Sequence, residues 1–201
     1  MKPFRVYLFR LVAVMGISFM LAGCTHNITI KSSEIPALQT GSPLKSISPK
    51  TFAFKEFRDI RWTDASLVGQ LWASKIRLDQ PAATVVATAI KKELERNGHT
   101  CLVDSPEVKA NFVIEGIVFK YWFAIDKGFF SVKGTGNVAV KLTISAVSPN
   151  RGVLAKNYEG EYQLSRGGGL PIHIEEILNP ALLAMIKEIS TDPELIAFIE
   201  K

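Results

Sequence analysis

The sequence is poor in the residues from which metal centres and many catalytic sites are built. Its 201 residues include two cysteines and three histidines, and none of them shows the spacing of a metal-binding motif such as H-E-x-x-H or C-x-x-C. The G-x-S-x-G turn of one class of hydrolases and the phosphate-binding P-loop are also absent. The sequence therefore predicts no metal, no cofactor and no catalytic residue, and we expect the histidines to be exposed: His26, His99 and His173.

Acidic residues are missing from the first 23 positions, which contain the cations Lys2, Arg5 and Arg10. An uncharged apolar run follows at positions 11–22. It is too short to cross a bilayer but long enough for the central part of a secretion signal. The run ends in Leu21-Ala22-Gly23-Cys24, which resembles the lipobox of bacterial lipoproteins.

The lipobox resemblance implies that residues 1–23 are a signal peptide and that Cys24 receives lipid, palmitate being one of the acyl chains. Residue 25 is Thr rather than Asp, which by analogy with two-membrane bacteria favours the outer membrane, with the protein facing the periplasm. Two or three acyl chains anchor a protein stably, whereas one chain binds a bilayer only marginally. The alternative is an uncleaved N-terminal helix with an incidental cysteine.

A strong excess of positive charge is also missing once the signal is removed. The full chain carries a net charge of +5, and loss of the three signal-peptide cations leaves +2. This balance removes the argument for a nucleic-acid partner. Cys101 is the single cysteine beside Cys24, so no intrachain disulfide is expected, and we predict that it is buried as a small apolar residue.

Two regions follow the signal. Residues 24–50 are rich in Ser, Thr, Pro, Gly and Lys, which predicts a lipidated, flexible tether with a short strand at 27–30. Residues 51–201 are predicted to form a single domain.

Within this domain, period-two alternation predicts strands at 51–57, 71–78 and 100–103. From residue 110 to 165 the alternation is interrupted by turn sequences at 126–128 and 149–152, which predicts a three-strand antiparallel meander.

Helical spacing predicts an amphipathic helix over residues 81–97 with Asp79 as its N-cap. A second helical segment starts near residue 172, and Asn179-Pro180 inside it marks either a kink or a new start. Asp192-Pro193 predicts a last short helix. The expected fold class is α+β: a largely antiparallel sheet containing the meander, covered on one face by the amphipathic helix and the C-terminal helices.

The densest charged cluster lies next to the end of the first predicted strand of the domain. It contains Arg58, Asp59, Arg61 and Asp64, with Trp62 among them. One hypothesis is a binding loop for a glycan, a peptide or a protein, with Trp62 as its anchor. The other is a local ion-pair network that only holds the loop in place.

Five aromatic residues flank the predicted turn at 126–128: Tyr121, Trp122, Phe123, Phe129 and Phe130. Alternation cannot bury all five on one face, so we expect an exposed contact surface for a partner or a membrane unless both faces are covered. Trp122, Phe129 and Phe130 are therefore added to the candidate partner-binding residues.

Several stretches together carry a family resemblance: Leu21-Ala22-Gly23-Cys24, Arg58-Asp59-Ile60-Arg61, Leu94-Glu95-Arg96-Asn97-Gly98, Lys156-Asn157-Tyr158-Glu159-Gly160 and Ser190-Thr191-Asp192-Pro193-Glu194-Leu195-Ile196-Ala197-Phe198-Ile199. In their order and spacing they resemble the YajG family of bacterial envelope lipoproteins, a family without an established activity. The strand, charged loop and helix also look like the small domains of accessory lipoproteins, some of which activate peptidoglycan synthases.

The resemblance implies a membrane-anchored periplasmic protein that acts as a non-catalytic binding or accessory module for an envelope partner, such as a cell-wall protein or peptidoglycan. Two alternatives stay open. One is a structural lipoprotein that oligomerises through a free strand edge. The other is a cell-wall hydrolase that uses paired carboxylates such as Asp59 and Asp64.

Overall fold

The structure is a computed structural model that describes residues 27–31, 41–71, 74–104, 109–128, 131–148, 152–167 and 173–200. In chain order these residues form β1 (Asn27–Ile30), the 3-10 helix η2 (Pro43–Ser46), β2 (Thr51–Phe54), β3 (Arg58–Asp59), β4 (Leu67–Leu71), β5 (Ser74–Leu78), α2 (Ala82–Arg96), β6 (Thr100–Val103), β7 (Phe112–Lys127), β8 (Ser131–Ala146), β9 (Val153–Gly167), α3 (Glu175–Thr191) and α4 (Pro193–Glu200).

One mixed sheet organises the described residues. The long strands β7, β8 and β9 form an antiparallel meander, as predicted. Along its other edge, β7 pairs in parallel with β2, β3 and β4 in turn, and the sheet continues from β4 through β5 to β1. The predicted α+β class with a largely antiparallel sheet is confirmed.

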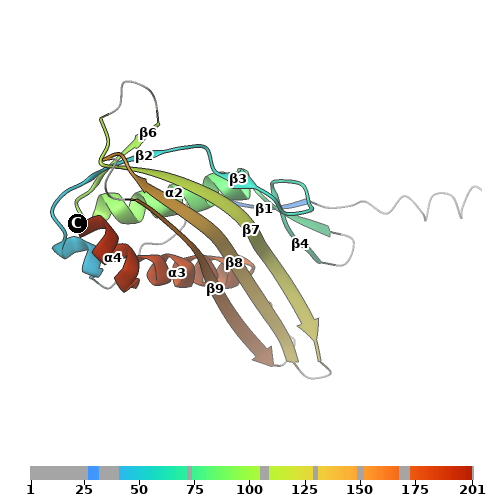
Figure 1. Cartoon of the computed structure of the whole chain (residues 1–201). Coiled ribbons are helices and arrows are strands. Elements are labelled where there is room, and N and C mark those ends of the chain that lie inside the picture. The colour runs from blue at the N-terminus through green and yellow to red at the C-terminus, as the bar shows by residue number, and fades with distance from the viewer. Residues whose placement is uncertain are drawn as a thin grey trace, which may run out of the picture.

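The helices lie on one face of this sheet, also as predicted (Figure 1). α2 contacts β7, and α3 contacts β8 and β9. The inward side chains of β8 alternate with outward ones, so that Val138, Val140 and Leu142 are buried against the helices. We call the opposite face, which carries no helix among the described residues, the outer face.

A β-bulge in β7 explains why its sequence shows apolar residues on both faces. The pairing with β8 shifts between Val118 and Lys120. Before the bulge Ile114 and Val118 point inward, and after it Tyr121 and Phe123 do so. A bulge inserts one residue and so reverses the phase of the alternation. The extra residue is Phe119, which is 39% exposed.

Local details of the prediction differ from the structure or are decided by it. The strand expected at 71–78 is a hairpin that begins earlier, with β4 and β5 paired antiparallel. The amphipathic helix begins at Ala82 with Pro81 as its N-cap and without a side-chain cap, so Asp79 is not the cap. Of the two alternatives at Asn179-Pro180, the new start is excluded, because α3 continues through Pro180. Neighbouring strands and packed helices decide these details, and the local sequence does not contain them.

Part of the segment predicted as a tether packs against the domain. β1 pairs with β5, which confirms the predicted short strand. Leu44 in η2 is fully buried, and the Ser42 hydroxyl donates a hydrogen bond to the Ser190 carbonyl oxygen of α3. Residues 42–47 thus contribute to the core, which reaches beyond the expected boundary at residue 51.

The predicted exposure of all three histidines is wrong for His99, which is buried. It follows the end of α2 directly, and its Nδ1 accepts a hydrogen bond from the Lys50 backbone N–H. Burial lowers the pKa of His99, which favours the neutral ring. His173 is exposed, and His26 lies outside the described residues.

Cys101 is buried, as predicted. Burial raises the pKa of its thiol to about 12. The thiol is therefore protonated and unreactive at neutral pH.

A buried carboxylate fixes the junction between α3 and α4. Asp192 accepts hydrogen bonds from the Tyr158 hydroxyl at 2.7 Å, the Lys156 ammonium at 3.0 Å and the backbone N–H of Glu194 at 3.0 Å. The last contact makes Asp192 the predicted N-cap of α4. Burial alone would raise the pKa of Asp192, but the three donors outweigh it and hold the pKa below its ordinary value.

We expect Asp192→Asn to lower the free energy of unfolding by about 1.5–3 kcal/mol at pH 7, the usual value of a hydrogen bond to a charged group. Because the folded-state pKa is depressed, this stabilisation is complete above the unfolded pKa of about 4 and disappears as the pH falls through the folded value. Urea titrations between pH 7 and 2 measure the difference. Glu194→Gln, which removes only an exposed contact with Lys156, should cost much less, and a difference that persists unchanged to pH 2 would contradict the assignment.

Candidate binding site

The charged loop after β3 is held by Arg61, whose side chain is only 5% exposed. Its Nε and Nη2 atoms bind the Asp59 carboxylate at 2.9 and 2.7 Å. The remaining guanidinium hydrogens reach the carbonyl oxygens of Leu67, Tyr121 and Ala65 at 2.7–2.9 Å. Every N–H of the guanidinium is used, so Arg61 ties the loop to β4 and β7. We call this arrangement the Arg61 clamp.

A second ion pair holds the other end of the loop. Asp64 binds Arg77 of β5 at 2.9 Å and accepts hydrogen bonds from the hydroxyl and backbone N–H of Ser66. The hydrogen bond from Arg77 is the main reason that the pKa of Asp64 lies well below its usual range.

These contacts do not favour Asp59 and Asp64 as a catalytic pair of carboxyl groups. A glycosidase needs one carboxyl whose pKa is raised, so that it carries a proton at neutral pH. Asp64 is shifted in the opposite direction, and Asp59 is bound by two nitrogens of Arg61. The geometry therefore gives the hydrolase hypothesis no support.

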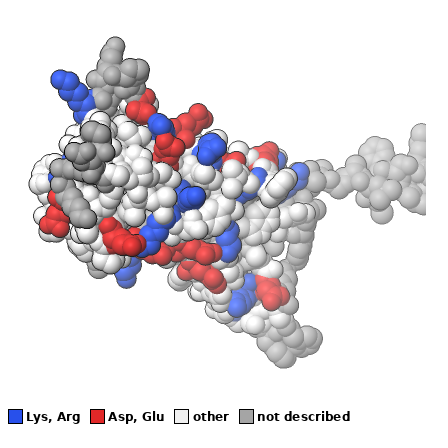
Figure 2. Space-filling model, in the orientation of Figure 1, with Lys and Arg blue, Asp and Glu red and all other residues white. Residues whose placement is uncertain are grey.

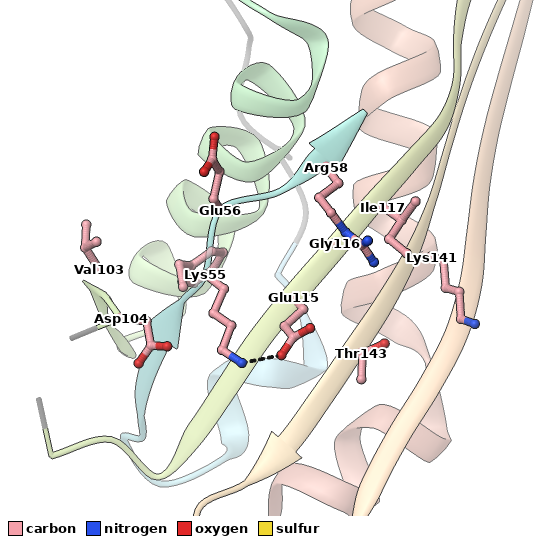
Figure 3. Close-up of a pocket in the computed structure, with 11 residues that line it drawn as sticks. Lys55, Glu56, Arg58, Val103, Asp104, Glu115, Gly116, Ile117, Lys141 and Thr143 are labelled. Atoms are coloured by element: carbon pink, nitrogen blue, oxygen red, sulfur yellow. Dashed lines mark hydrogen bonds and ion pairs between the residues drawn. The ribbon is translucent and has the colours of Figure 1, made fainter. Parts of the chain in front are cut away.

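A groove of about 750 Å³ opens on the outer face near the ends of β2 and β6. Its lining includes Lys55, Arg58, Asp104, Glu115 and Lys141. Lys55 and Glu115 form an ion pair at 2.6 Å. Figure 3 shows this pair between Asp104 on one side and Arg58 and Lys141 on the other. The side chains of Arg58 and Lys141 make no hydrogen bond or ion pair with other described residues.

A second feature of the outer face is apolar. Trp62 projects fully into solvent, and Ile60 and Phe119 are 56% and 39% exposed. Together with Trp122 they line a shallow cavity of about 300 Å³ beside the loop. We call these four residues the aromatic patch. The Arg61 clamp holds the backbone from which Ile60 and Trp62 project.

The predicted candidate residues thus separate into different roles. Asp59, Arg61 and Asp64 are engaged in holding the loop, whereas Arg58 faces the groove and Trp62 is exposed beside Trp122. Tyr121 and Phe123 are buried, and Phe129 and Phe130 lie outside the described residues. Sequence reasoning missed Lys55, Glu115 and Lys141, since only strand pairing brings them beside Arg58.

The surface charge agrees with a mixed rather than a one-signed partner surface. On the face that Figure 2 shows, Lys and Arg are interspersed with Asp and Glu. Within the described ranges no three or more His, Cys, Asp or Glu side chains form a group that could hold a metal ion. In the same ranges no helix is long and apolar enough to span a bilayer.

The fold and the site define a small α+β domain. Helices cover one face of its sheet, and the groove and the aromatic patch lie on the other face. The chain belongs to the family described as uncharacterized lipoprotein, whose model matches residues 69–200. That description names no catalytic activity, and membership supports a place in the cell envelope. No curated protein matches the sequence.

Solved structures are similar to this chain at low sequence identity. A crystal structure from Xanthomonas campestris is 10% identical, with a TM-score of 0.50 over 86% of this chain and 95% of that one. A hypothetical protein from Chlamydia trachomatis is 10% identical, with a TM-score of 0.44 over 76% and 98% of the two chains. A minor lipoprotein from Acinetobacter baumannii is 12% identical, with a TM-score of 0.38 over 75% and 93%. The first similarity shows the fold alone.

Proposed function

We propose that this protein is a YajG-like lipoprotein, anchored through acylated Cys24 in the outer membrane, that acts as a non-catalytic binding module in the periplasm. The family match and the lipobox sequence support the anchor. Thr25 in place of Asp supports the outer membrane. The partner is an envelope component, and a protein of cell-wall synthesis or peptidoglycan itself is the concrete expectation.

The observation that carries this function is the groove on the outer face. Arg58 and Lys141 stand at one side of it without partners among the described residues. A guanidinium is well suited to bidentate binding of a carboxylate, and Arg is enriched at protein interfaces. The apolar surface between them, provided by Ile117, adds a contact that excludes water. A partner segment that brings acidic groups to this face fits the groove.

Photocrosslinking in cells tests the proposal on the full lipoprotein. A photoreactive amino acid at position 143, beside Lys141 in the groove, should capture one recurrent envelope protein or peptidoglycan fragment. The variant Arg58→Glu/Lys141→Glu should reduce this capture at least tenfold. The control Lys92→Glu/Lys187→Glu makes the same charge change at exposed positions on the helices and should leave capture unchanged. If both variants captured equal amounts of the partner, the groove would not be the binding site.

A second function is favoured by one observation. Among the described strands β9 pairs only with β8, so its other edge is open. The N–H of Glu159 on that edge is occupied by the Glu188 carboxylate at 2.7 Å, which limits pairing to the residues beyond it. An oligomer built through this edge would make the protein structural, and a monomer in solution argues against it.

A further inference from the structure

The aromatic patch brings together three exposed hydrophobic side chains, those of Ile60, Trp62 and Phe119. Trp62 has no contact that shields it from water, since it is 103% exposed. Exposed aromatic and aliphatic residues that gather in one place mark a protein or membrane contact. The connection from Arg61 to the Tyr121 carbonyl oxygen fixes the patch over β7.

Strand register places the start of β1 at the same level of the sheet as this patch. Asn27 pairs with Lys75, and Lys75 pairs with Gln70 in β4. The preceding residue, Gly69, pairs with Phe123 in β7. Asn27 is therefore level with Ala124, three strand spacings or about 14 Å across the sheet. Figure 1 shows β1 beside β4, at the end of the molecule away from β6.

The chain before β1 is too short to hold the domain far from its anchor. Cys24 precedes Asn27 by three residues, and three extended residues span at most about 11 Å. The bilayer that receives the Cys24 acyl chains must then lie within about 11 Å of Asn27. That reach is shorter than the roughly 14 Å across the sheet between Asn27 and β7, the strand that carries Phe119 and Trp122 of the patch.

The residues around the patch fit a bilayer surface. Trp is enriched at membrane–water interfaces, where its apolar body and its N–H are both accommodated. Lys75 is exposed beside Asn27 on β5 and has no ion pair in the described structure. An ammonium in this position attracts anionic headgroups. The groove lies at Glu115–Ile117 of β7, on the other side of the bulge from the patch.

We infer that the aromatic patch docks on the bilayer that carries the protein's own lipid anchor, with Trp62 at the interface and Lys75 against anionic headgroups. The domain then has one orientation, in which the groove lies at the end of the outer face remote from the anchor. This inference rests on the lipidation of Cys24 in the proposed function, and it does not depend on the partner.

The test uses the full lipoprotein purified from membranes and reconstituted into vesicles of phosphatidylethanolamine and phosphatidylglycerol. An environment-sensitive fluorophore is attached to Trp62→Cys or, as a matched control, to Val147→Cys, which is 56% exposed and directly follows the last residue of β8. Native thiols do not interfere, since Cys24 is acylated in the lipoprotein and Cys101 is buried. Nitroxide-labelled lipid should quench the probe at position 62 at least threefold more than the probe at position 147.

Flotation of the vesicles distinguishes failure of the proposed lipid anchor from failure of the docking inference. If the protein does not float with lipid, the anchor in the proposed function is wrong. If it floats but both probes are quenched equally, or neither is, the anchor stands and the docking inference is overturned. Crosslinking of position 62 to a protein without quenching by lipid would also overturn it, in favour of a protein partner at the patch.

Discussion

Replacement of Gly160 should destabilise this protein more than any exposed substitution. Gly160 lies in β9 directly against α3, where an added Cβ would overlap the Ala181 carbonyl oxygen and the Met185 backbone N. Both obstacles are backbone atoms, so a rotamer change cannot relieve the overlap and the helix must move. We expect Gly160→Ala to lower the free energy of unfolding by about 3 kcal/mol or more, and Gly160→Val to prevent folding.

A loss of stability on Gly160→Ala is informative, because alanine in a strand is otherwise more stable than glycine. In the absence of a clash, Gly→Ala stabilises by reducing the entropy of the unfolded chain. Urea denaturation should rank three variants. Gly41→Ala, with nothing within 4 Å, should change stability by less than about 0.5 kcal/mol. In Gly136→Ala the added Cβ would lie 2.9 Å from the Ile177 carbonyl oxygen. Its loss of stability should fall between those of Gly41→Ala and Gly160→Ala. A neutral Gly160→Ala would mean that α3 does not lie this close.

The same contact illustrates what the sequence can and cannot predict. The periods of β8 and α2 are visible in the sequence because one face of each is buried and the other is not. Gly160 in Asn157-Tyr158-Glu159-Gly160 looks like any strand glycine, because the residues that require it, Ala181 and Met185, are more than twenty positions further along the chain. The bulge at Phe119 is equally hard to predict from the sequence. A reversal of the inward–outward alternation between two apolar runs looks the same as a strand with two buried faces.

The candidate site shows the same division. The sequence marked the cluster from Arg58 to Asp64 but left open whether it binds a partner or holds a loop. The structure divides it, with Arg61 and Asp59 in the clamp and Arg58 in the groove. The groove also needs Glu115 and Lys141, which reach it through strand pairing. Pairing over such separations depends on the whole fold, which no local pattern contains.

Loss of Arg61 should unfold the loop and lower the free energy of unfolding by much more than the loss of an exposed ion pair would. In Arg61→Met the Asp59 carboxylate, with its side chain 12% exposed, loses its charged partner, and three carbonyl oxygens lose a donor. Breaking a buried pair from one side costs about 3–5 kcal/mol. We expect a loss in this range by urea denaturation, together with rapid amide hydrogen exchange in residues 60–66.

Two further arginine variants show whether geometry or charge produces this effect. Arg61→Lys keeps the charge but offers three donors where the guanidinium uses five in a planar fork, so we expect it to recover only part of the loss. Arg58→Met, three residues away and without a partner among the described residues, should change stability by less than about 0.5 kcal/mol. If Arg61→Met and Arg58→Met were equally mild, the clamp would not hold the loop. Trp62 would then have no fixed position from which to meet a membrane or a partner.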